Sequence, residues 1–505
     1  MEQLAGIIGW INGVIWSPPM IVLCIGAGLY FSVRLKFPQI RYIKEMILLT
    51  KNGQGSSSGI SPFQAFATTV GARVGIGNIA GVATAVHFGG PGAIFWMWLI
   101  TFFGAGSAFV ETVLGQAYKT KRHDGEYVGG PAFYIEKGLK LKSLAWVFVA
   151  ATLIGPGLFM PGVQMHSITA TIQEAFNINE FVTAIGVCVV IGLVICGGIK
   201  RIGKTAELLI PFMCLLYLLL TLGVCLMRFE DIPKVFVLIF SSAFGLEEAY
   251  GGIIGATIAW GIKRGVYSNE AGMGSGALLA APAECKHPTT QGLVQILSVY
   301  ADTLVICTAS ALIVLLSGSF NIVDPDGEVL VENLPGVQYG ILYVQHGLNT
   351  VMPGVWAGKL LAVSVTLFAF TTIMGYYYQA ESNISYLFKD QLYMIWVFRI
   401  LFLLSNFFGV LIEGSILWDM ADIGVGSMAW INLIAILFLS RQAVIILRDY
   451  EKQVQTGREP SFDPTIINVE DEAGIWSKQT SSASSDNSRA SVKLSPGKAE
   501  PHIET

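Results

Sequence analysis

Gly71-Ala72-Arg73-Val74-Gly75-Ile76-Gly77-Asn78-Ile79-Ala80-Gly81 interrupts an apolar run, 62–86, that is otherwise long enough to cross a bilayer as a helix. Four glycines and one arginine stand at mid-membrane depth. Backbone that leaves the helix in hydrocarbon must find other hydrogen-bond partners, so a broken helix survives only where it lines a cavity. A buried arginine there is also costly and indicates a functional site. The pattern predicts the discontinuous helix of a secondary transporter.

The composition of the whole chain is typical of a polytopic membrane protein. Of its 505 residues, 53% are hydrophobic and only 13% are charged, whereas soluble domains carry about 25% charged residues. The net charge of -4 predicts no nucleic-acid partner. The seven cysteines follow no metal-site or disulfide spacing, and Met1-Glu2-Gln3 lacks the basic start of a signal peptide.

Two short matches to nucleotide-binding motifs are set aside. Gly75, Gly77 and Ala80 fit the dinucleotide fingerprint, and residues 198–205 fit the P-loop pattern. Each motif needs a strand before it and a helix after it, whereas both matches here are flanked by membrane-length apolar segments. We therefore expect no pump that hydrolyses a nucleotide, and no cluster of residues indicates an enzyme.

At about 20 apolar residues per span, the sequence predicts an all-α protein with about eleven transmembrane helices. They cover residues 5–33, 62–87, 92–118, 143–173, 180–199, 205–227, 236–262, 291–317, 353–386, 391–412 and 418–441. We place a second interruption in the seventh span, at Gly251, Gly252 and Gly255. Pro156 and Pro161 predict a kink in the fourth span.

Lys and Arg concentrate in alternate loops and in the C-terminal tail. The positive-inside rule then places the N-terminus outside and the C-terminus in the cytoplasm, which requires an odd number of spans. Lys263 and Arg264 are assigned to a cytoplasmic loop on this basis. From about Glu451 the tail becomes polar and rich in serine, and we expect it to be disordered.

The two interrupted helices stand five spans apart. Residues 62–235 and 236–445 therefore form two sets of five, and an odd number per set makes the second enter from the opposite face. This predicts a five-plus-five inverted-repeat core of the LeuT type, with an extra helix and a cytoplasmic connector in 1–61 and a cytoplasmic tail in 446–505. The alternative from another class is an ion channel or passive pore. Two broken helices in one chain favour alternating access.

Four longer motifs carry a resemblance to a known family; they are residues 72–85, 89–98, 125–131 and 265–275. Together they resemble the alanine or glycine:cation symporters (sodium:alanine symporters) of bacteria and archaea, over about residues 5–445. The resemblance implies a multi-pass protein of the plasma (inner) membrane. It also implies uptake of a small neutral amino acid, alanine or glycine, coupled to sodium or proton flux, with sodium as a co-transported ligand and no cofactor. Oligomeric state is not predicted.

This chain departs from the family pattern at three places. Ile76 stands where a Thr is usual, Tyr376 where a Trp is usual, and Leu246-Glu247-Glu248-Ala249 where a Pro-Gln-Ala-Ala-like stretch is usual. These departures leave open a larger neutral substrate such as glutamine.

An amino acid needs hydrogen-bond donors for its carboxylate. A break at Gly75, Ile76 and Gly77 frees N–H groups, and the half-helix that starts near Asn78 presents its positive end there. We expect the carboxylate at this point, with the Asn78 side chain assisting. The alternative is that the glycines only permit close helix packing.

The ammonium group needs acceptors. Gln164, in the fourth span, matches a family glutamine that contacts the substrate, so the resemblance implies that its amide oxygen accepts from the ammonium. Without the family resemblance, a hydrogen bond between helices explains Gln164 equally well. We expect Gly251 and Gly252 to supply the facing backbone and Tyr376 an aromatic wall.

Sodium prefers oxygen ligands, as other hard cations do. The carbonyls of Gly71 and Val74 with the hydroxyls of Thr371 and Thr372 would form such a site, a pattern that resembles the sodium site of this fold. The alternative is that each threonine bonds a carbonyl of its own helix.

Several charged or polar residues are assigned to pairs or gates. Arg73 and Asp302 each lie roughly 16 Å deep at 1.5 Å per residue, which favours an ion pair; the alternative is that Asp302 binds the coupling cation. Glu111 lies nearer the cytoplasmic end and is expected to pair with a basic loop. Asn269 and Glu270 follow the seventh span, and the resemblance implies a role in the inner gate.

Overall fold

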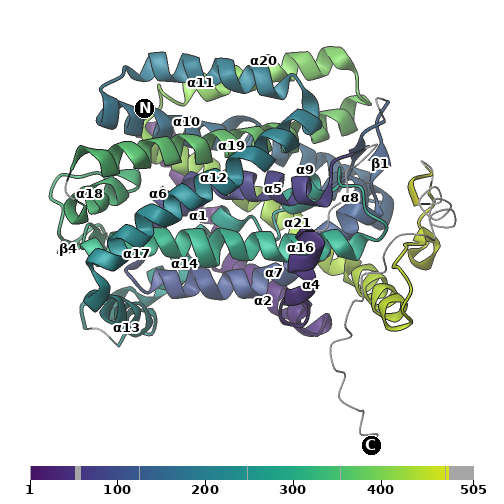
Figure 1. Ribbon diagram of the computed structural model, residues 1–505, viewed down its shortest axis with the longest axis horizontal. Coiled ribbons are helices and arrows are strands. Elements are labelled where there is room, and N and C mark those ends of the chain that lie inside the picture. The colour runs from purple at the N-terminus through teal and green to yellow at the C-terminus, as the bar shows by residue number, and fades with distance from the viewer. Residues whose placement is uncertain are drawn as a thin grey trace, which may run out of the picture.

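The computed structural model describes residues 2–51, 59–123, 125–246, 248–352, 354–471 and 474–476. It is nearly all helical, as the sequence predicts (Figure 1). Within these residues, eight helical stretches are long and apolar enough to cross a membrane, and two shorter apolar helices, Glu180–Ile195 and Leu392–Phe408, accompany them. The predicted seventh span, 236–262, is wrong in its bounds: residues 232–243 form a separate helix, and a broken helix over residues 254–280 takes the place of that span.

The elements follow the predicted order. The chain begins with α1 (Glu2–Ile15), α2 (Pro18–Arg34), α3 (Pro38–Arg41) and α4 (Ile43–Lys51). The next group is α5 (Pro62–Arg73), α6 (Ile76–Gly89), α7 (Ala93–Ala117), β1 (Thr120–Lys121), β2 (Tyr127–Val128), α8 (Pro131–Leu139), α9 (Lys142–Ile154), η1 (Gly155–Phe159), α10 (Met160–Phe176), α11 (Glu180–Ile195) and α12 (Gly198–Met227).

The second group starts after η2 (Phe229–Asp231). It is α13 (Ile232–Ala243), η3 (Glu248–Ile253), α14 (Ile254–Asn269), α15 (Ser275–Ala280), α16 (Pro288–Tyr300), η4 (Ala301–Cys307), α17 (Thr308–Ser317), β3 (Asn321–Val323), β4 (Val329–Glu332), α18 (Ile341–Val351), α19 (Val355–Phe388), α20 (Leu392–Phe408), α21 (Gly414–Gln455) and η5 (Pro464–Ile467). The strands form two antiparallel hairpins, β1–β2 and β3–β4.

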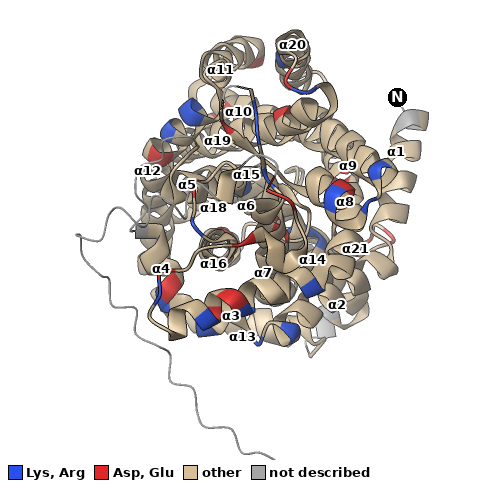
Figure 2. Ribbon diagram, turned by 90° about the vertical axis from the view of Figure 1, so that its right-hand side faces the viewer, with Lys and Arg blue, Asp and Glu red and all other residues tan. Residues whose placement is uncertain are grey.

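The long helices run between two ends of the molecule (Figure 1). One end carries α13, α18 and the β3–β4 hairpin, and we call it the hairpin side. The other carries α8, the β1–β2 hairpin and residues 456–476, and we call it the tail side. Figure 2 views the tail side directly and shows many Lys and Arg segments spread over it. These positions match the alternate loops and the tail in which the sequence concentrates its basic residues.

The first break is confirmed where the glycine pattern places it. α5 ends at Arg73 and α6 begins at Ile76, and Val74 and Gly75 between them have non-helical backbone angles. The predicted kink in the fourth span is also present, because a π-helical turn, η1, lies between α9 and α10 at Pro156. Prolines remove a helix hydrogen bond and so favour such turns.

The second break lies elsewhere than predicted. The glycines at 251, 252 and 255 fall in η3 and at the start of α14, and residue 247 of the neighbouring stretch lies outside the described residues. The helix instead breaks between α14 and α15, where Glu270, Gly272 and Gly274 have left-handed φ values of 54°, 85° and 92°. α14 packs against α6 and α15 against α5, so the two broken helices lie side by side with their breaks at the same level.

Lys263 and Arg264 are not in a loop. Both lie in α14, and both pair with Asp422 of α21, at 2.7 and 2.6 Å. The Lys263 ammonium also donates to Asn12 Oδ1 of α1 at 3.3 Å. The charges suggested a loop, but a partner more than 150 residues away makes their burial possible.

The tail is ordered further than expected. α21 continues to Gln455, and Phe462 and Trp476 are only 2% and 3% exposed. The Lys119 ammonium lies 4.9 Å from the Trp476 ring centroid, and the Phe462 N–H donates to the Lys286 carbonyl at 2.9 Å. A few apolar residues in a polar segment are sufficient to attach it to the tail side. Residues 477–505 lie outside the described residues.

We expect Asp422→Asn to destabilise the protein by about 3–5 kcal/mol, because removing one partner of a buried ion pair leaves uncompensated charge. Thermal unfolding of the purified protein in detergent measures the change. Asp326→Asn, in an exposed turn of the β3–β4 hairpin, is the matched control and should leave the melting temperature unchanged. Equal melting temperatures for all three proteins would contradict this interpretation of the Lys263, Arg264 and Asp422 cluster.

Candidate functional site

The first break is enclosed by α10, α14 and α19 at distances that only glycine permits. A Cβ added to Gly75 would lie 2.4 Å from Thr372 Oγ1 of α19 and 3.0 Å from Gln164 Oε1 of α10. A Cβ added to Gly77 would lie 2.9 Å from the Tyr267 ring of α14. Close packing, which the sequence left as an alternative, is therefore real at both glycines. The same closeness brings polar groups of α10, α14 and α19 to the break.

Side-chain amides hold the N–H groups that the break frees. The Gly75 N–H donates to Asn78 Oδ1 at 2.9 Å, and the Ile76 N–H donates to Gln164 Oε1 at 3.1 Å. In this conformation both amide oxygens are thus used by the backbone. These roles differ from the predicted ones. Asn78 caps α6. The amide oxygen of Gln164 is used by the Ile76 N–H, and its amide nitrogen has no hydrogen-bond partner among the described residues.

Asp302 joins the two broken helices. Its carboxylate accepts from Asn78 Nδ2 of α6 at 2.6 Å, from Ser268 Oγ of α14 at 2.8 Å and from Thr303 Oγ1 at 2.7 Å. It is fully buried and lies in the π-helical segment η4, a kind of turn that is frequent at functional sites.

The predicted ion pair between Arg73 and Asp302 is wrong. Arg73 is buried but donates to Ser298 Oγ and, at 3.4 Å, to the Gln295 carbonyl. Ser298 stands four residues before Asp302 on a continuous helix, so the two lie on the same face about one turn apart. Arg73 is therefore bound one turn away from the level of Asp302.

Glu111 does not pair with a basic loop. It is fully buried, and its Oε2 accepts from the Gly274 N–H and from Asn432 Nδ2, both at 2.9 Å. Its face of α7 points to the second break rather than to the loops. Glu111 therefore does for the second break what Asn78 does for the first, because it binds a backbone N–H that has left the helix.

Asn269 and Glu270 lie in the second break and not at the cytoplasmic end of the span. Asn269 Nδ2 donates to Thr101 Oγ1 of α7 at 3.1 Å, and Asn269 Oδ1 accepts from the Ala271 N–H at 3.0 Å. Glu270 is fully buried, and its Oε2 accepts from Gln379 Nε2 of α19 at 3.4 Å.

Three of the four predicted sodium ligands converge. Thr372 Oγ1 lies 2.9 Å from the Gly71 carbonyl and 3.4 Å from the Val74 carbonyl, so α19 and the end of α5 meet through oxygen atoms. The Thr371 hydroxyl instead donates to the Phe368 carbonyl of its own helix at 2.9 Å. This is the ordinary behaviour of a threonine within a helix.

Of the remaining predicted residues, Tyr376 lies close to the first break, whereas Gly251 and Gly252 do not. Tyr376 is buried on α19, one turn after Thr372. Gly252 is exposed, and neither it nor Gly251 packs closely against α6, since an added Cβ at Gly252 meets nothing within 4 Å. The facing surface that these glycines were expected to supply comes from Tyr267 and Ser268, which belong to the motif at 265–275.

Several buried polar atoms around the breaks have no hydrogen-bond partner among the described residues. They include Gln164 Nε2, the Tyr267 hydroxyl and Glu270 Oε1, and also Arg73 Nε and Nη2, Glu111 Oε1, Ser275 Oγ and Gln379 Oε1. Buried polar groups are nearly always hydrogen-bonded, because leaving one unpaired costs about 1–3 kcal/mol. A donor, a hydroxyl and a carboxylate oxygen left unpaired near two helix breaks together fit a small ligand that carries both a carboxylate and an ammonium.

Comparisons with known proteins show the family of this chain. The model of the "Sodium:alanine symporter family" matches residues 1–464. A "Sodium/proton-dependent alanine carrier protein" of Bacillus sp. (strain PS3) is 41% identical over 85% of this chain and 97% of its own length. "Probable sodium/glutamine symporter GlnT" of Bacillus subtilis (strain 168) is 40% identical over 94% of this chain and 97% of its own.

A solved structure supports the fold alone. The crystal structure of MhsT in complex with L-phenylalanine superposes with a TM-score of 0.51 at 13% identity, over 78% of this chain and 99% of that chain. The predicted LeuT-type arrangement is thereby confirmed. From the matched family, the relatives and this fold, we conclude that the chain belongs to the sodium:alanine symporter family.

Proposed function

We propose that this protein is a secondary symporter that couples inward sodium flux to the uptake of a small neutral amino acid, by alternating access. The observation that carries the proposal is the meeting of two broken helices around unpaired polar atoms of Gln164, Tyr267 and Glu270. Proton coupling is the second possibility for the ion, since one relative is named for both ions.

The close packing around Gly75 and Gly77 favours alanine or glycine as the substrate. An added Cβ at Gly75 or Gly77 would meet neighbouring side chains at 2.4 or 2.9 Å, and Tyr376 is buried one turn after Thr372, the proposed sodium ligand. A site enclosed this closely by backbone and side chains favours a substrate with a short side chain. Glutamine is the second candidate, because one relative is named as a glutamine symporter and because Ile76 and Tyr376 depart from the family pattern.

The cation site is proposed at Gly71, Val74 and Thr372. Two carbonyls and one hydroxyl already lie together there, and oxygen is the ligand type that hard cations prefer. Thr371 is left out of this proposal because its hydroxyl is used within α19. A cation at this position would link α5 to α19, and so one broken helix to an unbroken one.

The orientation and repeats follow the same reasoning. We propose that the tail side faces the cytoplasm of a bacterial or archaeal cell, because Lys and Arg gather there and positive loops stay inside. Residues 62–235 and 236–445 are proposed as the inverted repeats. Their first helices, α5–α6 and α14–α15, are both broken, and each half of one packs on a half of the other.

We expect Thr372→Ala to raise the sodium concentration for half-maximal uptake at least roughly tenfold, the effect of about 1.4 kcal/mol, because one ligand oxygen is removed. Thr371→Ala is the matched control, and should change the value much less. The measurement is initial uptake of labelled alanine against sodium concentration. Equal curves for the two variants would contradict the assignment of Thr372.

Competition identifies the substrate. Uptake of labelled alanine by the unaltered protein should be inhibited by unlabelled alanine and glycine at similar concentrations, and by glutamine only at roughly tenfold or higher concentrations, since even one extra methylene in a tight pocket can cost a factor of 10. Inhibition by glutamine at concentrations as low as those for alanine would contradict the small-substrate proposal and favour the second candidate.

A further inference from the structure

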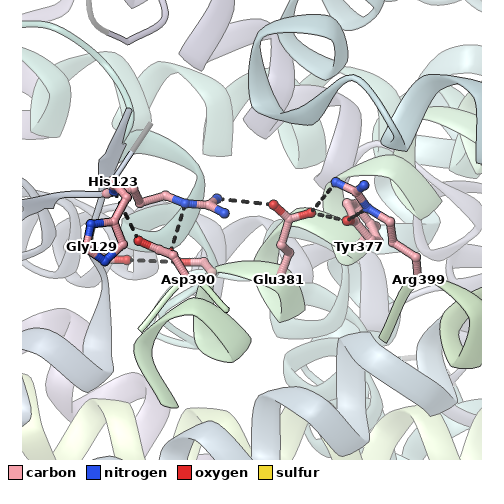
Figure 3. A network of polar contacts seen from close by, with 8 residues as sticks. His123, Gly129, Tyr377, Glu381, Asp390 and Arg399 are labelled. Atoms are coloured by element: carbon pink, nitrogen blue, oxygen red, sulfur yellow. Dashed lines mark hydrogen bonds and ion pairs between the residues drawn. The ribbon is translucent and has the colours of Figure 1, made fainter. Parts of the chain in front are cut away.

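A network of charged residues crosses the tail side between the β1–β2 hairpin and α19 (Figure 3). Arg122, in the hairpin loop, pairs with Glu381 of α19 at 3.1 Å and with Asp390, just after α19, at 3.1 Å. Glu381 also pairs with Arg399 of α20 at 3.7 Å. The Tyr377 hydroxyl donates to Glu381 and accepts from Arg399 Nε at 2.8 Å.

The charges in this network balance and are largely shielded from water. The side chains of Arg122, Glu381, Arg399 and Asp390 are 7%, 3%, 11% and 16% exposed, and they carry two positive and two negative charges. A buried ion pair is stable only when complete, since removing one partner leaves an uncompensated charge. The network therefore holds only while the hairpin loop and α19 stay in contact.

The network joins the loop after α7 to α19, two helices whose main packing partners differ. α7 packs on α2, α14 and α16, whereas α19 packs on α10, α12 and α5, and α5 in turn touches α16. A second contact lies beside the network, because Ser382 Oγ donates to the Gly129 carbonyl at 3.5 Å (Figure 3). The seam between the β1–β2 hairpin region and α19 is thus closed on the tail side by polar contacts.

The turn after α19 contains two successive residues in the left-handed backbone region. Lys389 and Asp390 have φ values of 49° and 60°, and two successive non-glycine residues in the left-handed region are costly. Asp390 is held there by Arg122 and by the His123 N–H, at 3.4 Å. When these contacts are lost, the turn is free to relax.

The same helix connects the network to the proposed cation site. α19 is continuous from Val355 to Phe388, and Glu381 follows Thr372 by nine residues, or about 13.5 Å at 1.5 Å per residue. A displacement of α19 relative to α5 at Thr372 would therefore also displace Glu381 relative to the hairpin loop. The proposed cation site and the Arg122 network therefore both involve the same continuous helix, α19.

We propose that the Arg122 network is the latch that holds the tail side closed, and that it separates when the amino acid and the cation leave toward that side. The proposal rests on the proposed transport function. Polar contacts suit such a seam, because each charged group regains water on opening and the hydration offsets much of the lost pairing. An apolar seam would lose its burial with no such compensation.

Arg122→Gln tests the latch. In inside-out vesicles, a membrane-impermeant thiol reagent is applied to the tail side of a Ser382→Cys protein, with sodium and alanine present, and reaction at position 382 is read by mass spectrometry. We expect Arg122→Gln to raise the labelling rate at least severalfold, to preserve alanine exchange, and to lower sodium-driven accumulation. Lys121→Gln is the matched control, since Lys121 takes no part in the network, and should label as slowly as the parent.

The Arg122→Lys variant distinguishes a role in the latch from a role in folding alone. It keeps the positive charge, so it should restore most of the protection at position 382. Unchanged labelling in Arg122→Gln would overturn the proposal, and so would loss of folded, alanine-exchanging protein in both the Gln and the Lys variants. Absence of sodium-dependent uptake by the unaltered protein would instead refute the transport function, while the labelling rates would still decide whether Arg122 closes this side.

Discussion

The backbone groups freed by the first helix break must be satisfied in a setting without water, where each unpaired group costs several kcal/mol. The Gly75 and Ile76 N–H groups are bound by the amides of Asn78 and Gln164, and the carbonyl end of α5 is reached by Thr372. These bonds fix α10 and α19 around the broken helix. The rest of the centre is arranged around this requirement.

The second break meets the same requirement with the Glu111 carboxylate, which binds the Gly274 N–H, and the Asn269 amide, which binds the Ala271 N–H. Asp302 accepts from one side chain of each broken helix. The two breaks are thereby connected through side chains as well as through packing. The unpaired atoms of Gln164, Tyr267 and Glu270 remain, which is the reason to place an amino acid between the breaks.

The sequence predicted the features that depend on local pattern, and missed those that depend on distant partners. The spans and the first break follow from apolar length and glycine spacing. The pairing of Arg73 with Asp302 failed because depth counted from the span ends was wrong by about one helical turn, and Arg73 binds Ser298 instead. Lys263 was read as a loop residue because its partner, Asp422, is remote in sequence. The second break was missed because Gly272 follows a polar run that resembles a loop.

The central claim is that sodium and the amino acid move together through one site that opens to either side in turn. The most direct test is uptake of labelled alanine into proteoliposomes that contain the purified protein, with and without an inward sodium gradient. We predict that the gradient drives alanine transiently above its external concentration, and that collapsing the gradient removes the accumulation. Equilibration to the same level under both conditions would contradict the account and indicate a passive pore.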